Sequence, residues 1–259
     1  MNPSRNDQAE AQDWFDNPQS RLVSSRHDYR ETTATAELSA AFLLSRYQTL
    51  NGSLPRSLLD IGCGEGLLLS HIAKNDPGIS LTGTDTATEA IAHARQILPL
   101  ARLLHHEGAP RGPFDAILIH LTLGLWTRTS DLLAHAVQQL SPRGLMYIVD
   151  INVDDLELGL SHSISDEERM YLRSQYASAY TLQQFTDLLT QAAPAEQGYM
   201  TSTGTATFAG FSFGSSEQLQ MMTATRVVKA LKKQQRSASS RLPALLHGWI
   251  FAHHERTSN

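Results

Sequence analysis

The chain has little cysteine and no long apolar run. Its 259 residues include one cysteine, Cys63, which excludes an intramolecular disulfide framework and a cysteine-rich zinc site and is typical of a reducing compartment. No uninterrupted apolar run approaches the roughly 20 residues needed to span a bilayer. The first residues are polar and lack the apolar core of a secretion signal. These absences predict a soluble, cytoplasmic protein with no membrane partner.

An excess of basic charge is also missing. The 21 Lys and Arg residues are outnumbered by 26 Asp and Glu residues, which gives a net charge of -5. Such a chain has no overall field that would attract a nucleic-acid backbone, so a polyanionic partner would need a local basic patch. The hydrophobic fraction of 41%, with 16 Gly and 10 Pro, is ordinary globular usage, and it excludes collagen, coiled coil and wholesale disorder.

Short apolar runs alternate with helical patterns over the middle of the chain. Candidate strands are residues 57–61, 80–84, 102–105, 114–120 and 145–151. Strands that alternate with helices are typical of βαβ units, so the pattern predicts an α/β fold with a doubly wound, mostly parallel sheet. Capping boxes predict helix starts at Thr86 with Glu89 and at Thr181 with Gln184. Residues 141–144 predict a turn before the fifth strand.

Three other segments surround this predicted core. Residues 1–50 predict a mobile N-terminus and a helical cap, residues 154–180 a lid-like insertion, and the stretch after Pro194 closing antiparallel strands. Residues 234–259 predict a linker and a C-terminal amphipathic helix, because Leu242, Leu245, Leu246, Trp249 and Ile250 repeat at helical spacing. We expect that helix to dock on the cap or on the second subunit of a homodimer.

A Gly-rich turn follows the first predicted strand. The sequence LLDIGCGEGL, residues 58–67, has an apolar strand, a G-x-G-x-G turn and an apolar helix start. Such glycines let backbone N–H groups approach a ligand at a helix N-terminus. Asp60 at this turn would repel a pyrophosphate but attract an ammonium and a sulfonium. Asp85 ends the second strand, where an acid in such folds accepts both ribose hydroxyls.

LLDIGCGEG followed by LTGTD resembles the class I S-adenosylmethionine-dependent methyltransferases. The resemblance continues in order through PFDAILIHLTLGLW, LSPRGLMYIVD and YTLQQFTDLLTQA, so that it covers residues 57–229. It implies a Rossmann-like, mostly parallel seven-stranded sheet with an antiparallel C-terminal hairpin. It also implies S-adenosylmethionine as cofactor, S-adenosylhomocysteine as product, and a methyltransferase domain over residues 51–233.

The resemblance assigns roles to particular residues. Asp60 and the turn from Gly62 to Gly66 would hold the methionine part of the cofactor, Asp85 the ribose, and the region after the third strand the adenine. The residues implied in cofactor binding are Asp60, Gly62, Cys63, Gly64, Gly66, Asp85, Thr86, His106, Glu107 and His120. No metal is expected, since His120 stands where magnesium-dependent members of the family carry an aspartate.

His120, at the carboxyl end of the fourth strand, is the candidate catalytic residue. An unperturbed imidazole pKa of about 6.5 suits a general base for a hydroxyl acceptor near neutral pH; a histidine that only hydrogen-bonds a loop carbonyl is the alternative. Candidate substrate residues are Tyr29, Trp126, Asp150, Asn152 and Tyr176. The N-P-P-[YFW] signature of nucleobase amino methylation is absent, because the matching stretch reads HLTL.

The predicted function is in-line methyl transfer to a small molecule, at a hydroxyl, carboxyl or nitrogen of a secondary metabolite. In such a reaction the protein mainly aligns an acceptor lone pair with a methyl group that is already activated. Two alternatives stay open. One is a catalytically idle S-adenosylmethionine-binding partner subunit, and the other is an RNA or protein methyltransferase, favoured by a basic cluster between Arg226 and Arg241.

Overall fold

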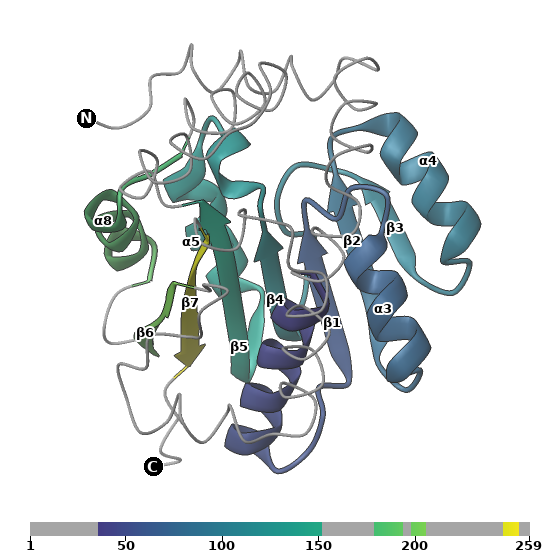
Figure 1. Cartoon of the computed structure of the whole chain (residues 1–259), viewed down its shortest axis with the longest axis horizontal. Helices are drawn as coiled ribbons and strands as arrows, with labels where there is room; N and C mark the ends of the chain where they lie inside the picture. Colours follow the sequence, from purple (N-terminus) through teal and green to yellow (C-terminus); the bar gives the residue numbers. More distant parts are fainter. Residues whose placement is uncertain (1–35, 152–178, 194–197, 206–245, 254–259) are drawn as a thin grey trace, which may run out of the picture.

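A mostly parallel sheet forms the centre of the molecule (Figure 1). The computed structural model describes residues 36–151, 179–193, 198–205 and 246–253. Their strands form a seven-stranded sheet in the order β3-β2-β1-β4-β5-β7-β6. Strands β1 to β5 are parallel, whereas β7 runs antiparallel to both β5 and β6. The predicted α/β class, with a mostly parallel sheet and antiparallel C-terminal strands, is therefore confirmed.

The strands begin and end close to the predicted positions. They are β1 (Ser57–Ile61), β2 (Ser80–Asp85), β3 (Arg102–His105), β4 (Phe114–His120), β5 (Leu140–Ile151), β6 (Gly198–Thr205) and β7 (Leu246–His253). The helices are α3 (Leu67–Asn75), α4 (Thr88–Ile97), α5 (Thr129–Gln138) and α8 (Leu182–Ala192), with a 3-10 helix η1 (Leu123–Leu125) and a further helix over residues 36–51. None of the helices in the described residues is long and apolar enough to cross a membrane.

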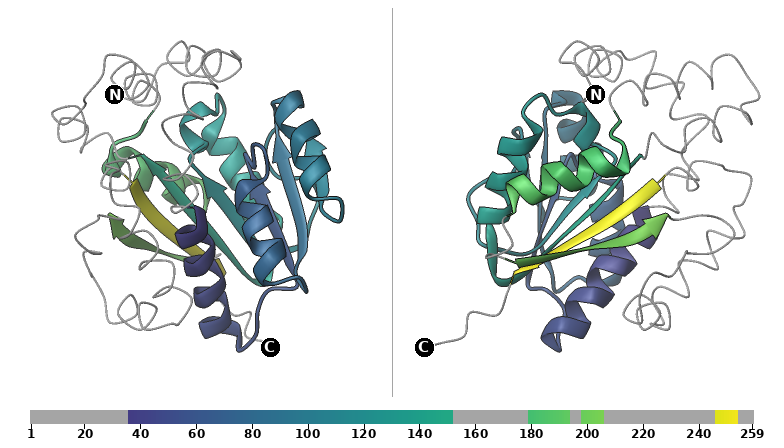
Figure 2. Two further views of the ribbon diagram at one scale, coloured as in Figure 1. Left: turned by 45° about the vertical axis from the view of Figure 1, so that its right-hand side comes forward. Right: turned by 90° about the vertical axis from the view of Figure 1, so that its left-hand side faces the viewer.

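Helices cover both faces of the sheet (Figure 2). The helix over residues 36–51, drawn in purple, shares one hydrophobic core with α3 and α4, while α5 and α8 share the core on the opposite face. Strand residues alternate between these cores: Leu118 and Val149 lie in the first, and Ile119 and Ile148 lie in the second. Because of this alternation, the position of a residue along its strand tells on which face of the sheet its side chain lies.

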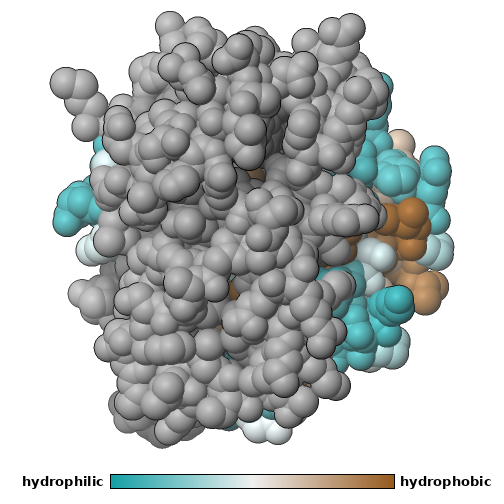
Figure 3. All heavy atoms as spheres, in the orientation of Figure 1, coloured by the Kyte–Doolittle hydropathy of each residue, from teal (hydrophilic) through white to brown (hydrophobic). Residues whose placement is uncertain are grey.

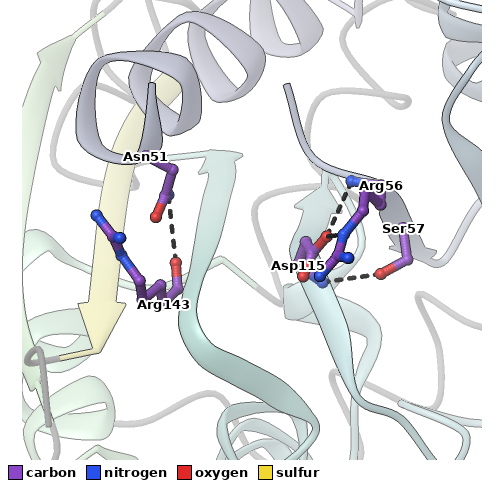
Figure 4. Close-up of polar contacts among 5 residues, drawn as sticks. All are labelled: Asn51, Arg56, Ser57, Asp115 and Arg143. Atoms are coloured by element: carbon purple, nitrogen blue, oxygen red, sulfur yellow. Dashed lines mark hydrogen bonds and ion pairs between the residues drawn. The ribbon is translucent and has the colours of Figure 1, made fainter. Parts of the chain in front are cut away.

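Polar contacts brace the amino ends of the strands (Figure 4). The buried carboxylate of Asp115 accepts a hydrogen bond from the Arg56 amide at 2.9 Å and lies 3.7 Å from its Nε. Arg143 donates to the Leu50 carbonyl at 3.1 Å, and Asn51 Nδ2 donates to the Arg143 carbonyl at 3.4 Å. These contacts fasten the end of the helix over residues 36–51 to β5.

The predicted C-terminal helix over residues 242–253 is wrong. Leu246–His253 forms β7, in which Trp249 pairs with Ile148 of β5. Periodicity cannot separate a short apolar run in a helix from one in a strand. The backbone groups along β5 need hydrogen-bond partners, and β7 supplies them as an antiparallel strand. The sheet therefore extends beyond the expected boundary at residue 233, and the described apolar residues 246–253 form a strand instead of a helix that docks on a cap or a second subunit.

The predicted capping box at Thr86 is also wrong. Helix α4 begins at Thr88 with Ala87 at its N-cap, and no side chain caps it. Asp85 accepts the Ala87 amide at 2.8 Å through its Oδ1 atom instead. The acid at the end of β2 therefore satisfies the amide of the N-cap residue itself, which is a different contact from the one that a capping box at Thr86 would make.

The predicted turn at residues 141–144 is displaced, whereas the predicted capping box at Thr181 is confirmed. Residues 141–144 lie inside β5, which begins at Leu140, and not ahead of it; the pairing between β4 and β5 shifts register at this point. A Cβ on Gly144 would lie 2.9 Å from the Ser141 carbonyl oxygen, so the chain does fold back tightly there. The capping box of Thr181 with Gln184 is confirmed at the start of α8.

A small apolar patch lies beside the edge strand β3, among hydrophilic side chains (Figure 3). The exposed large hydrophobic residues among the described ones are Ile97, which is 46% exposed, and Leu100, which is fully exposed and precedes β3 by two residues. Arg95 covers part of the adjoining edge, since its Nη2 atom donates to the Leu103 carbonyl at 2.9 Å. Charged cover of this kind hinders pairing of an edge strand with another chain.

Candidate active site

The Gly-rich turn between β1 and α3 adopts a conformation that favours glycine. Gly62, Gly64 and Gly66 have φ angles of 77°, 51° and 80°, in the left-handed region that disfavours residues with a Cβ. The amides of Gly62 and Cys63 donate to the Thr84 carbonyl at 2.8 and 2.9 Å. These hydrogen bonds fasten the turn to the carboxyl end of β2.

The three glycines have different surroundings. A Cβ on Gly62 would lie 2.6 Å from the Cβ of Thr122, and one on Gly66 would lie 2.7 Å from Cδ1 of Leu98. Among the described residues, a Cβ on Gly64 would meet nothing within 4 Å. The outer glycines therefore allow close packing against the loop after β4 and against α4. The middle glycine borders open space at the carboxyl edge of the sheet, where open α/β sheets bind their ligands.

Asp85 is joined directly to this turn. Its Oδ2 atom accepts the Gly64 amide at 2.8 Å, while Oδ1 accepts the Ala87 amide at 2.8 Å. A carboxylate offers about four lone-pair directions, so both oxygens retain capacity to accept the ribose hydroxyls that the resemblance implies.

Asp60 lies beneath the turn as a buried acid. Its side chain is only 2% exposed. Burial and, to a lesser extent, the charge of Asp85 raise the pKa of Asp60 to about 7. A cation beside the two acids would lower that pKa again and favour both carboxylates. The two carboxylates would attract a cofactor with an ammonium and a sulfonium, and they would repel a pyrophosphate.

Cys63 lies between the first two glycines of the turn, and its thiol is buried and not part of a disulfide. Burial, followed by the charges of Asp60 and Asp85, raises the pKa of the Cys63 thiol well above its ordinary value. A Cβ on Gly83 would lie 2.8 Å from Cys63 Sγ. The thiol therefore fills space between the turn and β2 in its neutral form.

The predicted adenine-side residues surround the end of β3. Thr86 and His106 are exposed, and Glu107 forms an ion pair with Arg128 at 3.1 Å. A cavity of about 620 Å³ at this end of the sheet is lined by Arg95, Leu104, His105, His106, Ala109, Pro110, Arg111 and His135. Within the described residues no group of three or more His, Cys, Asp or Glu side chains is placed to hold a metal ion.

His120 ends β4 on the same face of the sheet as Asp60. Asp60 pairs with Leu118, two residues before His120. The Nε2 atom of His120 is buried and has no hydrogen-bond partner among the described residues. Burial lowers the pKa of His120 to about 4, so the imidazole is neutral at neutral pH. A buried ring nitrogen without a partner is a candidate for contact with a ligand.

The loop after His120 contains a strained residue. Leu121 has a φ of 57° although it is not glycine, and such strain clusters at functional sites. Its amide donates to the Val149 carbonyl at 2.8 Å. The next residue, Thr122, is the one that leaves no room for a Cβ on Gly62. The loop after β4 is therefore in contact with the Gly-rich turn.

The predicted substrate residues are only partly described. Asp150 lies two residues after Ile148 on β5 and therefore on the same face as Ile148, opposite to His120; its Oδ2 atom accepts the Leu123 amide at 2.8 Å. Trp126 is buried, 6% exposed. Tyr29, Asn152 and Tyr176 lie outside the described residues. The structure therefore brings His120 to the face of Asp60 and does not bring Asp150 to that face.

A buried hydrogen bond near the start of α5 was missed by the sequence reasoning. Thr129 Oγ1 lies 2.9 Å from Tyr180 Oη and also donates to the Trp126 carbonyl at 2.9 Å. The Tyr180 ring meets Phe185 of α8 edge-on. The capping box after Tyr180 predicts a helix there, but no sequence signal indicates a partner so far away along the chain.

With this geometry, the chain can be compared with known proteins. Residues 27–193 match the sequence profile of a methyltransferase domain family. The chain belongs to the class I S-adenosylmethionine-dependent methyltransferases. The predicted family is therefore confirmed.

Two solved methyltransferase structures match nearly the whole chain. The plantazolicin methyltransferase BpumL, in complex with a pentazolic desmethylPZN analog and SAH (S-adenosylhomocysteine), is 36% identical with a TM-score of 0.84 over 96% of this chain and 97% of that chain. The plantazolicin methyltransferase BamL, with a triazolic analog and SAH, is 30% identical with the same TM-score and coverage.

A curated relative matches a shorter part. The trans-aconitate 2-methyltransferase of Yersinia pestis (strain Pestoides F) is 27% identical over 123 residues, which are 46% of this chain and 46% of that protein. The match therefore spans about half the length of that relative.

Proposed function

We propose that the chain transfers a methyl group from S-adenosylmethionine to a small acceptor that contains azole rings. The observation that carries this proposal is the likeness to BpumL and BamL, which extends over 96% of the chain and beyond the residues matched by the family profile. Both of those proteins are in complex with SAH and an azole-containing analog. The match to the trans-aconitate enzyme is shorter, at 46% of the chain, and supports only the methyltransferase activity and not the class of acceptor.

The residues around the Gly-rich turn fit the cofactor. Asp60 and the turn would hold the methionine part of the cofactor, with its ammonium and sulfonium, and Asp85 would accept the ribose hydroxyls. The open space at Gly64 lets the cofactor approach the backbone. When bound, the cofactor supplies an activated methyl group. The protein then contributes mainly position, which is the largest requirement of an in-line displacement.

The protonation state of His120 bears on the acceptor atom. A general base is most effective when its pKa lies near the working pH, whereas the pKa of His120 is about 4. The neutral ring is therefore a weak base for a hydroxyl. Its buried Nε2 atom suits a hydrogen bond that orients a nitrogen acceptor, since a neutral amine already has a reactive lone pair. Of the hydroxyl, carboxyl and nitrogen acceptors that the sequence left open, we therefore favour nitrogen.

The test uses two azole-containing acceptors that differ only in a terminal amine or hydroxyl. Each is incubated with the full chain and S-adenosylmethionine, and mass spectrometry follows methylated product and SAH. Methylation of the amine compound in preference to the hydroxyl compound is expected. As a matched control, Asp187→Asn replaces an exposed acid of α8 and should retain activity. SAH binding without methylation of either compound would favour the idle partner subunit.

A further inference from the structure

The buried carboxylate of Asp150 caps the 3-10 helix η1. Its Oδ2 atom accepts the amides of Leu123 at 2.8 Å and Gly124 at 3.4 Å, and the residue is 7% exposed. The first amides of a helical turn have no partner inside that turn. Here the partner comes from the end of another strand, β5, and an ionised acceptor makes the shorter of these bonds stronger than a neutral cap would.

This cap stands next to the strained residue of the site. Leu121, with its φ of 57°, lies two residues before the capped Leu123. On the other side, the Leu121 amide is held by the Val149 carbonyl. A residue stays in a sparsely populated conformation only where its surroundings determine that conformation from several directions. The end of β5 supplies two such restraints, one from the Val149 carbonyl and one from the Asp150 carboxylate.

The strained turn positions groups on both sides of it. His120 immediately precedes Leu121, so the direction of the turn and that of the imidazole are linked through one peptide unit. Thr122 immediately follows and fills the space against Gly62 of the Gly-rich turn. A change in the loop would therefore move the His120 ring and the contact that supports the cofactor turn.

We propose that Asp150 is a positioning residue for methyl transfer, which holds the strained turn at Leu121 through its cap on η1. It lies on the sheet face opposite His120 and acts on that residue through the loop backbone. The kinetic part of this inference rests on the proposed function. The structural part does not, because it concerns only hydrogen bonds within the chain.

The first test measures the cap itself by amide hydrogen exchange in the free protein. Asp150→Asn keeps the shape of the side chain and removes its charge. We expect the Leu123 and Gly124 amides to exchange about tenfold faster or more, because they lose a charge-assisted partner. The matched control, Asp187→Asn, should leave them unchanged. Unchanged exchange in Asp150→Asn would overturn the proposal, whether or not an acceptor has been found.

The second test separates positioning from direct contact with the acceptor. Asp150→Ala should lower kcat about 10- to 100-fold and leave the acceptor KM within about threefold, as expected for an effect on the transition state. Leu121→Gly removes the penalty on positive φ. In the Leu121→Gly background, Asp150→Ala should therefore lower kcat by a clearly smaller factor. A rise in KM with an equal effect in both backgrounds would mean that Asp150 touches the acceptor, and would overturn the proposal.

Discussion

The two ends of the parallel strands are built in opposite ways. At the amino ends, Asp115 and Arg143 hold the strands and the helix over residues 36–51 through hydrogen bonds and an ion pair. At the carboxyl ends, Asp60 has a raised pKa, His120 has a lowered pKa and a buried nitrogen without a described partner, and Leu121 is strained. A buried group with a shifted pKa and a strained backbone each lower the free energy of unfolding. Perturbed pKa values and backbone strain cluster at functional sites, so their occurrence together at one end supports the cofactor site proposed there.

The largest loss of stability and SAH affinity is expected for Gly62→Ala. The matched comparison is Gly52→Ala, because the two glycines have nearly equal φ angles. Gly62 at the carboxyl end has 77° and Gly52 near the amino end has 75°, but only Gly62 lacks room for a Cβ. Gly52→Ala should cost about 1 kcal/mol of unfolding free energy. Gly62→Ala should cost a few kcal/mol and reduce SAH affinity more than about 100-fold, because backbone strain and overpacking add. Denaturant titration and calorimetry measure both. Equal losses would remove the distinction between the two ends.

The next effect concerns Asp60. Its folded pKa of about 7 exceeds the ordinary 3.8, so the stability contributed by the protonated carboxyl is fully present below pH 3.8 and is lost as the pH rises through about 7. At pH 8, Asp60→Asn should therefore exceed the wild type in unfolding free energy by up to a few kcal/mol. Thermal melts at that pH should show the same order of stability.

The same variant should bind S-adenosylmethionine more weakly than the wild type. The sulfonium cation loses a nearby negative charge, so the loss should exceed the loss for SAH, whose sulfur is neutral. Parallel titrations with the two ligands measure this difference. A variant that is less stable than the wild type at pH 8 would contradict a raised pKa for Asp60.

A smaller effect is expected at His120. Its folded pKa of about 4 lies below the ordinary 6.5, so the folded state loses stability when the pH falls from about 6.5 toward 4. His120→Gln should remove this part of the acid sensitivity, about 1 to 3 kcal/mol between pH 7 and 4. Ring proton shifts in NMR measure the pKa directly. A midpoint near 6.5 would mean that the ring is open to water in the free protein.

The smallest effect should come from Arg143. The side chain is exposed and donates to the Leu50 carbonyl at a helix end, so Arg143→Ala should cost only about 0.3 to 1 kcal/mol of stability. SAH affinity should not change, because the contact lies at the amino ends of the strands. Weaker SAH binding in Arg143→Ala would show that the two ends of the sheet are coupled.

Much of the sheet and the cofactor turn could be predicted from local sequence. β1, β3 and β4 have the bounds that apolar runs predict, since strands buried on both faces leave a continuous apolar pattern. The Gly-rich turn was predictable because few residues other than glycine tolerate its φ angles. Both signals depend only on neighbours in the chain.

The features that sequence could not supply depend on distant partners. The apolar run that forms β7 fits a helix and a strand equally well, and its antiparallel pairing with β5 decides for the strand. The capping role of Asp150 joins it to Leu123 across 27 positions. The pKa of His120 follows from burial by segments that only the folded chain brings together. Each outcome is a tertiary effect that overrides or adds to a local pattern.

The most direct test of the account is calorimetric titration of SAH into the wild type, Asp85→Ala and the control Asp187→Asn. Asp85 would contact the ribose and also holds the Gly64 amide, so its loss should weaken SAH binding by about 1.5 to 3 kcal/mol, or about 10- to 150-fold. Asp187→Asn should bind as the wild type does. Equal affinity of Asp85→Ala and the wild type, or no binding of SAH by the wild type, would contradict the assignment of the carboxyl edge as a cofactor site.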